Sequence, residues 1–188
     1  FFANAHYGDS TTANGTVTFY RGALSQAWPV GFGSRNSELE FLSEALFTLD
    51  DNGTVKREAW GGLFLKGTDP KQNVFSVNAS DFTNLHYFSL SVPSGSQAII
   101  NVFGDAVTIT GFGNGYSGVD ATNVLFNFEA TSLYARSYGF FGTVLAPNAH
   151  VDFSNGSWDG GLYAYSMVGN AEGHLFPAFV DPHVHLRT

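Results

Sequence analysis

The chain has 188 residues, 44% of them hydrophobic and 16% aromatic, and its 8 Lys and Arg against 16 Asp and Glu give a formal net charge of -8. Nucleic acid and anionic membrane surfaces are therefore disfavoured as partners, because both are bound by basic side chains that neutralise phosphate. No cysteine is present, which excludes disulfides, thiolate metal sites and cysteine nucleophiles, and no apolar run approaches the roughly 18 residues that membrane insertion of a helix requires.

The first 20 residues are expected to form an extended N-terminal arm that ends in a first strand at 16–20, where polar and apolar residues alternate. One β-helical domain with a flanking helix is predicted over 21–177, followed by a C-terminal tail over 178–188. Because the sequence begins with Phe1-Phe2 rather than Met, we also expect an upstream segment to have been removed, which favours export.

One α-helix is predicted at 37–49. Ser37 and Glu40 have the spacing of a capping box, in which the first side chain accepts a hydrogen bond from the backbone three residues later. Four leucines recur at helical spacing and give this helix one apolar face: Leu39, Leu42, Leu46 and Leu49. The turn at 50–53, which contains two aspartates, an asparagine and a glycine, is expected to end the helix.

Short strands separated by Gly, Pro, Asn and Asp are predicted beyond residue 60. They are 63–65, 74–77, 87–92, 98–103, 107–110 and 124–128. The glycine-rich stretch 111–118 between the last two is expected to be a protruding loop. Within it, Gly113–Gly118 matches the G-x-G-x-x-G dinucleotide fingerprint, but a strand rather than a helix is predicted next, so no cofactor is expected.

The last part of the sequence is periodic, with a constant step of 18 in residue number. This step relates Gly142 to Gly160 and Phe140 to Trp158, and it also relates Val144-Leu145-Ala146 to Leu162-Tyr163-Ala164. At about 3.3 Å per residue, one period travels roughly 60 Å, enough for three short sides around an apolar core. The predicted fold class is therefore all-β, a β-helix (β-solenoid) with about 18-residue coils and one flanking α-helix, with a β-sandwich as the alternative.

Little in the sequence points to catalysis or to a metal site. Serine, histidine and acidic residues do not stand in the order or the motifs of a hydrolase. Asp181, His183 and His185 have the types needed for a zinc site, but so near a chain end we interpret them as a polar terminus. A β-helical enzyme acting on polysaccharide would need acids one coil apart, and the residue one period after Asp152 is Asn170. We therefore expect no enzyme activity, no catalytic residue and no metal.

Two features suggest a connection with glycans. Four sequons are candidate glycosylation sites: Asn14, Asn52, Asn78 and Asn155. Four aromatic residues are candidates for stacking on sugar rings, with core packing as the simpler interpretation: Trp60, Tyr116, Trp158 and Tyr163.

The stretch Gly142-Thr-Val-Leu-Ala-Pro-Asn-Ala149, followed by Gly160 and by Gly169-Asn-Ala-Glu-Gly-His174, resembles the closing signature of the bacterial choice-of-anchor A domain. Shorter similarities upstream extend the resemblance over roughly residues 38–177. It implies a secreted or surface domain of β-helical fold, to which adhesion is attributed and for which no catalysis is established. Seven matching residues are assigned structural roles: Gly142, Ala146, Pro147, Gly160, Glu172, Gly173 and His174.

In that family, glycine-rich strand repeats precede the region matched here, so the first coil of this chain is expected to be uncovered. An uncovered strand edge pairs readily with another chain. We therefore predict an extracellular or cell-surface structural or adhesive protein that self-assembles into a filament or surface layer, through strand exchange or end-to-end stacking. Its expected partners are copies of itself and a matrix protein or glycan, and the alternative function is a carbohydrate-binding module of a surface protein.

Overall fold

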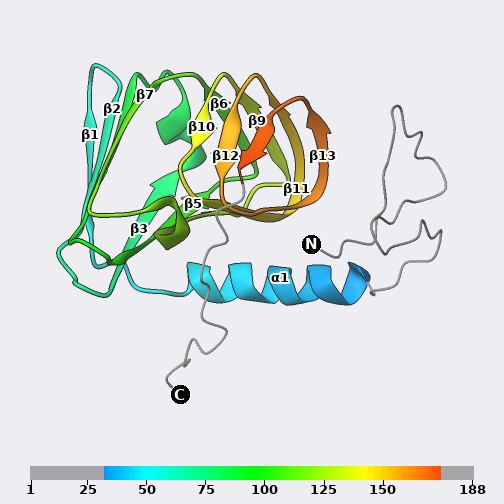
Figure 1. The fold of residues 1–188 in the computed structure, drawn as a ribbon, viewed down its shortest axis with the longest axis horizontal. Coiled ribbons are helices and arrows are strands. Elements are labelled where there is room, and N and C mark those ends of the chain that lie inside the picture. Colours follow the sequence, from blue (N-terminus) through cyan, green and yellow to red (C-terminus); the bar gives the residue numbers. More distant parts are fainter. Residues whose placement is uncertain (1–31, 175–188) are drawn as a thin grey trace. The chain divides into compact units, whose positions relative to one another are not determined.

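The computed structural model describes residues 32–174, with side chains described from residue 36 onward (Figure 1). The chain divides into two compact units, Phe1–Glu38 and Leu39–Thr188, and the fold given below is that of the second. The expected arm over 1–20, the tail over 178–188 and the predictions on Asn14, Asp181, His183 and His185 lie outside the described residues.

Helix α1 (Phe32–Phe47) begins earlier and ends earlier than the predicted range of 37–49. Ser37 thus lies inside the helix, and its predicted role as the N-cap is wrong. The residues before it include Gly33, Ser34 and Asn36, which are weak helix formers, so local propensity placed the start too late. The predicted apolar face is confirmed, since Leu46 is buried and packs with Leu39, Leu42 and Leu49 against Val74, Ile99 and Leu145.

The rest of the described fold is mostly β-structure arranged in three sheets (Figure 1). The first has the order β1 (Thr54–Glu58), β2 (Gly62–Lys66), β4 (Tyr87–Ser91), β7 (Gly113–Ser117). The second has the order β3 (Gln72–Asn78), β5 (Gln97–Phe103), β8 (Val124–Phe128), β11 (Thr143–Ser154), β9 (Ser132–Arg136), β6 (Ala106–Thr110), with β13 (Leu162–Gly169) also paired to β11. The third has the order β10 (Gly139–Phe140), β12 (Ser157–Asp159), β14 (Glu172–His174).

Among the described strands, every pairing is parallel except that of β1 with β2. Parallel partners must come from successive passes of the chain, and Figure 1 shows the strands curling around a common interior. The prediction of an all-β fold is therefore confirmed. An antiparallel β-sandwich does not fit this pairing.

The spacing between paired strands changes along the chain. Gly62 of β2 pairs with Tyr87 of β4, and Tyr87 pairs with Gly113 of β7, so the first two steps in residue number are 25 and 26. Only the later pairings, such as Phe140 with Trp158, have the predicted step of 18. A uniform 18-residue coil therefore does not describe the chain, although the expected stacking of Phe140 next to Trp158 is confirmed.

The difference in spacing comes from one wall of the fold. The earlier turn has the five-residue strand β7 and the short 3-10 helix η2 (Ala121–Asn123) before β8. The later turn has only the two-residue strand β10 before β11. The 18-residue period therefore describes only the later turns, because the earlier turn has a longer strand and a 3-10 helix where the later turn has only β10.

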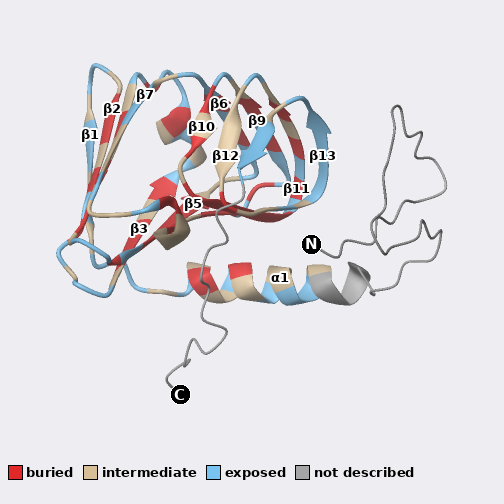
Figure 2. Cartoon of the chain, viewed as in Figure 1, coloured by how far each residue is buried: buried red, intermediate tan, exposed pale blue. Residues whose placement is uncertain are grey.

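Buried residues occur on strands throughout the fold (Figure 2), and aromatic side chains contribute much of the core that the strands enclose. Phe140 is 1% exposed and makes edge contacts with Phe126, Phe128, Tyr138 and Phe153 at centroid distances of 5.4, 6.1, 5.0 and 5.7 Å. These rings come from several successive passes of the chain. The core is thus a stack to which each pass adds aromatic rings, and edge-to-face pairs of this kind add stability beyond area burial.

The strand edges at the start of the fold are partly covered. Strand β1 pairs antiparallel with β2, and the backbone N–H groups of Asn52 and Gly53 both donate to the carbonyl of Val74 in β3. The side chain of Asn52 also donates to the carbonyl of Gln72 and accepts from the N–H of Val74, at 2.8 and 2.7 Å. The hairpin thus covers the edge of β2 and the turn covers part of the edge of β3, whereas the outer edge of β1 has no strand partner within the described residues.

The opposite end carries the exposed strand. Within the described residues, β13 has β11 as its only strand partner, and most of its residues are exposed (Figure 2). Tyr165 and Val168 are 65% and 64% exposed. Strand β13 thus presents an exposed strand edge at the later end of the described fold.

Candidate functional site

The glycines of the sequence signature are positions of close backbone approach. Gly142 and Gly160 have φ angles of 144° and 151°, in the region where side chains are rarely accommodated. A Cβ on Gly142 would lie 2.6 Å from the carbonyl oxygen of Val124, and one on Gly160 would lie 2.9 Å from Oγ1 of Thr143. Their 18-residue spacing therefore reflects two turns that touch, and no ligand need be invoked.

Ala146 and Pro147 lie in the middle of the long strand β11 and are both buried. Residues before them pair with β8, and residues after them pair with β9. The register with β13 also shifts between Ala146 and His150. Proline cannot donate to a strand ladder, so the Ala-Pro step lies where β11 passes from one set of partners to the next.

Glu172, Gly173 and His174 form strand β14. Nδ1 of His174 lies 2.7 Å from Oδ1 of Asp159 in the neighbouring strand, and its Nε2 lies 3.7 Å from Glu172. The hydrogen bond to Asp159 raises the pKa of His174. A Cβ on Gly173 would lie 2.5 Å from the indole of Trp158. Within residues 36–174 no group of three or more metal-ligating side chains occurs.

Two of the four candidate sugar-stacking residues face the interior. Tyr116 packs against Phe88 and Phe141, with ring centroids 5.9 and 4.6 Å away, and its hydroxyl lies 3.2 Å from that of Tyr138. Burial raises the pKa of Tyr116 to about 12. Trp158 is partly buried against the core. Tyr163 and Trp60 remain as exposed candidates, at 46% and 55%.

The predicted loop at 111–118 is mostly a strand. Gly113–Ser117 form β7, which pairs in parallel with β4 over five residue pairs. The glycines are needed because the ring of Tyr87 lies over them, and a Cβ on Gly115 would come 2.5 Å from its hydroxyl. The prediction of a protruding loop is wrong, because a glycine-rich strand beneath an aromatic ring lacks the alternation by which strands are recognised.

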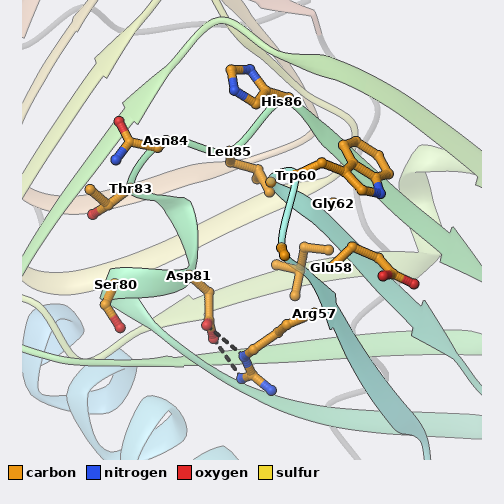
Figure 3. Close-up of a pocket in the computed structure, with 13 residues that line it drawn as sticks. Arg57, Glu58, Trp60, Gly62, Ser80, Asp81, Thr83, Asn84, Leu85 and His86 are labelled. Carbon is orange, nitrogen blue, oxygen red and sulfur yellow. Dashed lines mark hydrogen bonds and ion pairs between the residues drawn. The ribbon is translucent and has the colours of Figure 1, made fainter.

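A cavity of about 500 Å³ lies where the β1–β2 turn meets the segment from the 3-10 helix η1 (Ala79–Phe82) to β4 (Figure 3). Its lining combines an exposed aromatic residue with polar and charged groups. The residues that bear these groups are Arg57, Glu58, Trp60, Ser80, Asp81, Thr83, Asn84 and His86.

An ion pair forms one wall of this cavity (Figure 3). Nε and Nη2 of Arg57 donate to Oδ1 and Oδ2 of Asp81, both at 2.6 Å. Oδ2 also accepts from the backbone N–H of Asn78 at 2.8 Å. Burial acts to raise the pKa of Asp81, but these hydrogen bonds and the Arg57 charge outweigh it and lower the pKa below its usual range. Both groups are therefore ionised and held in a fixed geometry.

Backbone contacts fix the upper wall. The N–H groups of His86 and Tyr87 donate to the carbonyl of Gly61, at 2.8 and 3.2 Å. A Cβ on Gly61 would lie 2.7 Å from the carbonyl oxygen of Asn84, and Asn84 itself has a φ of 59°. Asparagine tolerates this left-handed conformation. The two segments thus touch through their backbones, and this contact positions the side chains of Asn84 and His86.

An aromatic row runs from the cavity across the outer face of the first sheet. The rings of Trp60 and Phe64 lie 6.0 Å apart edge to face, and those of Phe64 and Tyr87 lie 6.0 Å apart. Gly62 allows the first contact, since a Cβ there would come 2.6 Å from both the Phe64 and Trp60 rings. The cavity is therefore continuous with a surface on which flat apolar faces can lie.

The sequons differ in their surroundings. Asn52 uses its side-chain amide to complete the edge of β3. All three described sequon asparagines, Asn52, Asn78 and Asn155, are exposed, and Asn155 lies in a turn with a φ of 53°. Exposed turns accept a glycan. A glycan on Asn52 would replace one of the two amide hydrogens of a side chain that is hydrogen-bonded to β3, so Asn52 is the less favourable of the three.

A family model described as "Putative Ice-binding-like adhesive domain" matches residues 2–175 of the chain. The match takes in the N-terminal region that the choice-of-anchor A resemblance leaves out, and it supports adhesion without identifying that particular family. No curated protein and no solved structure matches the chain significantly. In the part of the chain that the structure describes, no helix has the length and hydropathy of a membrane span.

Proposed function

The chain belongs to the ice-binding-like adhesive family, and on that premise we propose that it is a secreted or cell-surface domain that attaches its bearer to another surface. Family membership over residues 2–175 is the observation that carries this proposal. Its role is structural and adhesive, without catalysis. In support, the residues that flank Asp152 in the adjacent strands are Tyr134 and Val168, so this acid lacks the carboxylate partner one coil away that polysaccharide cleavage would need.

We propose that the fold is an irregular β-solenoid. Its turns are longer at first, as the pairings of Tyr87 with Gly62 and Gly113 indicate, and they shorten to a step of 18 where Phe140 pairs with Trp158. Stacked parallel turns bury one continuous core and present regular outer faces. Rigid faces of this kind suit adhesion, because little conformational entropy is lost on contact.

Adhesion is tested with beads that carry the full chain. The beads are placed under shear flow on glass, on a hydrophobic surface, on a protein-coated surface and on a polysaccharide-coated surface. Retention on at least one surface, at a shear that removes beads carrying the heat-unfolded chain, is the expected result. Equal loss of both kinds of bead from every surface would contradict an adhesive role.

Self-assembly is the second part of the proposal, and its site is the edge of β13. Exposed edges with apolar side chains accept strands from other molecules, and Tyr165 and Val168 are strongly exposed there. The donor is residues 1–20 of a second copy, where an alternating strand is predicted at 16–20. Part of the edge of β3 is already occupied by Asn52 and Gly53.

The oligomeric state of dilute purified protein tests this assembly. Deletion of residues 1–20 and the edge substitution Val168→Lys are each expected to convert an oligomer to a monomer. Thr108→Lys, at an exposed position of β6, is the matched control and should leave the oligomer intact. A monomeric parent chain, or an oligomer that survives both changes, would refute assembly through this edge.

We propose that Asn78 and Asn155 carry glycans when the host attaches them, and that Asn52 does not. Peptide mapping of native material with and without glycosidase checks both statements. A glycan found on Asn52 would show that the edge of β3 opens before modification.

A further inference from the structure

We propose that the cavity between the β1–β2 turn and the η1–β4 segment is a glycan-binding site that takes a neutral pyranose ring. The inference rests on the proposed adhesive function, for which it supplies a class of ligand. The cavity volume of about 500 Å³ lies within the range of small-ligand sites. Its residues come from parts of the chain that are fixed by backbone hydrogen bonds, so the site is formed in advance of binding.

Trp60 supplies the apolar face that a sugar ring requires. Its indole is 55% exposed at the tip of a tight hairpin, and Figure 3 shows it projecting beside the cavity. The C–H face of a pyranose is weakly positive and packs on the electron-rich face of an aromatic ring. Phe64 and Tyr87 continue the aromatic surface away from the cavity, so a second sugar unit has somewhere to lie.

The ion pair supplies hydrogen bonds in the arrangement that sugars recognise. Arg57 uses Nε and Nη2 to bind Asp81 and retains its other N–H groups for a ligand, since a guanidinium has five donors. The Asp81 carboxylate is only an acceptor, and it can accept one more hydrogen bond from a ligand hydroxyl. Two neighbouring sugar hydroxyls, each both donor and acceptor, can therefore bind this pair together.

Two further side chains have hydrogen-bonding capacity to spare. Within the described residues, neither the amide of Asn84 nor the imidazole of His86 makes a hydrogen bond to another protein group. Both side chains belong to the segment whose backbone is pinned to Gly61. Their backbone positions are thus fixed on the cavity wall, and their side-chain donors and acceptors can bind the hydroxyls on the far side of a ring.

Charge selects a neutral ligand. Arg57 is already neutralised by Asp81, and Lys56 lies 2.6 Å from Glu58. A phosphorylated or sulfated ligand needs unpaired cations, and binding to nucleic acid is disfavoured for a chain with a net charge of -8. The site therefore favours neutral sugars over anionic ligands, even where an anionic ligand could stack on Trp60.

The test is binding of the full chain to an array of neutral oligosaccharides ending in glucose, galactose, mannose or N-acetylhexosamine, followed by calorimetry with a soluble oligosaccharide that binds. Trp60→Ala is expected to weaken binding about tenfold or more. Asn84→Gly, which removes the amide but keeps the left-handed backbone, should also weaken it. Phe41→Ala removes an exposed aromatic ring on α1, which does not line the cavity, and should leave binding unchanged.

Thermal melts of each variant separate loss of binding from loss of folding, and Asn84→Gly serves as the second probe if Trp60→Ala unfolds. The site is refuted if the parent chain binds no array member, if Trp60→Ala and Asn84→Gly bind as the parent does, or if Phe41→Ala weakens binding equally. Beads that adhere while the array stays blank would refute the site and leave adhesion standing. Array binding without bead adhesion would refute the adhesive function and leave the site standing.

Discussion

The attachment of helix α1 to the second sheet depends on a buried amide network that mutation can test directly. Asn127 in β8 accepts from Oγ of Ser43 at 2.6 Å and donates to the carbonyl of Ser43 at 3.1 Å and to Oδ1 of Asn101 at 2.9 Å. Asn101 in turn donates to the carbonyl of Leu46 at 2.8 Å. Both asparagines are 0% exposed. Asn127→Ala is expected to destabilise the fold by about 2–4 kcal/mol.

The magnitude follows from the partners that the substitution leaves behind. The hydroxyl of Ser43 can rotate and donate to a carbonyl of its own helix, so losing its hydrogen bond to Asn127 costs little. Oδ1 of Asn101 has no such freedom and becomes an unsatisfied buried acceptor, at a cost of about 1–3 kcal/mol. The space vacated by the amide adds about 1 kcal/mol.

Urea denaturation followed by circular dichroism measures this loss as a change in midpoint at constant slope. Asn148→Ala, at an exposed position of β11, is the control and should cost less than about 0.5 kcal/mol. The double variant with Asn101→Ala should lose less than the sum of the single variants, because both remove the same hydrogen bond. A loss in Asn127→Ala no larger than the control, or strict additivity, would refute the network.

Three further outcomes are expected. Phe140→Ala should lower the free energy of unfolding by about 3–5 kcal/mol, because four rings surround Phe140. Urea denaturation measures this loss, and a loss below about 1 kcal/mol would mean that the stack can collapse around the gap. The lowered pKa of Asp81 means that its ion pair stabilises the fold above roughly pH 4, and that this stabilisation is lost as the pH falls through the folded-state pKa. Asp81→Asn should therefore remove this part of the pH dependence of the melting temperature in acid, and an unchanged pH profile would contradict the ion pair. The raised pKa of His174 has the opposite sign: its stabilisation is complete below about pH 6.5 and is lost as the pH rises through the folded-state pKa, so an NMR titration that gives an unshifted pKa for His174 would disprove the contact with Asp159.

Local features were predictable from the sequence because their causes are local. The leucines of α1 face the sheet, since helical spacing alone places Leu39, Leu42 and Leu46 on one side. The step of 18 predicted the pairing of Phe140 with Trp158, since in this part of the chain each turn follows the last with no insertion. Strands in which apolar and polar residues alternate, and strands that are apolar throughout, were predictable for the same reason.

The features that were missed depend on distant parts of the chain. Strand β7 could not be recognised from Gly113–Ser117 alone, because its glycines are explained only by the ring of Tyr87 in the neighbouring strand. The partial covering of the first coil depends on β1 running antiparallel to β2, which no repeat predicts. The cavity depends on the meeting of Arg57 and Asp81, which are far apart along the chain. Of the residues that line the cavity, only Trp60 was indicated by the sequence, as an aromatic residue able to stack on a sugar ring.

The contrast between the two ends of the fold has a mechanical consequence for a domain under load. At the later end, β14 is held to β12 by three residue pairs, and a tether pulling beyond His174 would break these bonds one after another as β14 lifts away. At the earlier end, β1 pairs with β2 through five antiparallel residue pairs, and a tether there must first detach α1 and then open the hairpin. In the proposed solenoid each turn interacts only with its neighbours. We therefore expect rupture to start at β14 and proceed towards β1, lengthening the tether in steps while the cavity beside Trp60 stays folded longest.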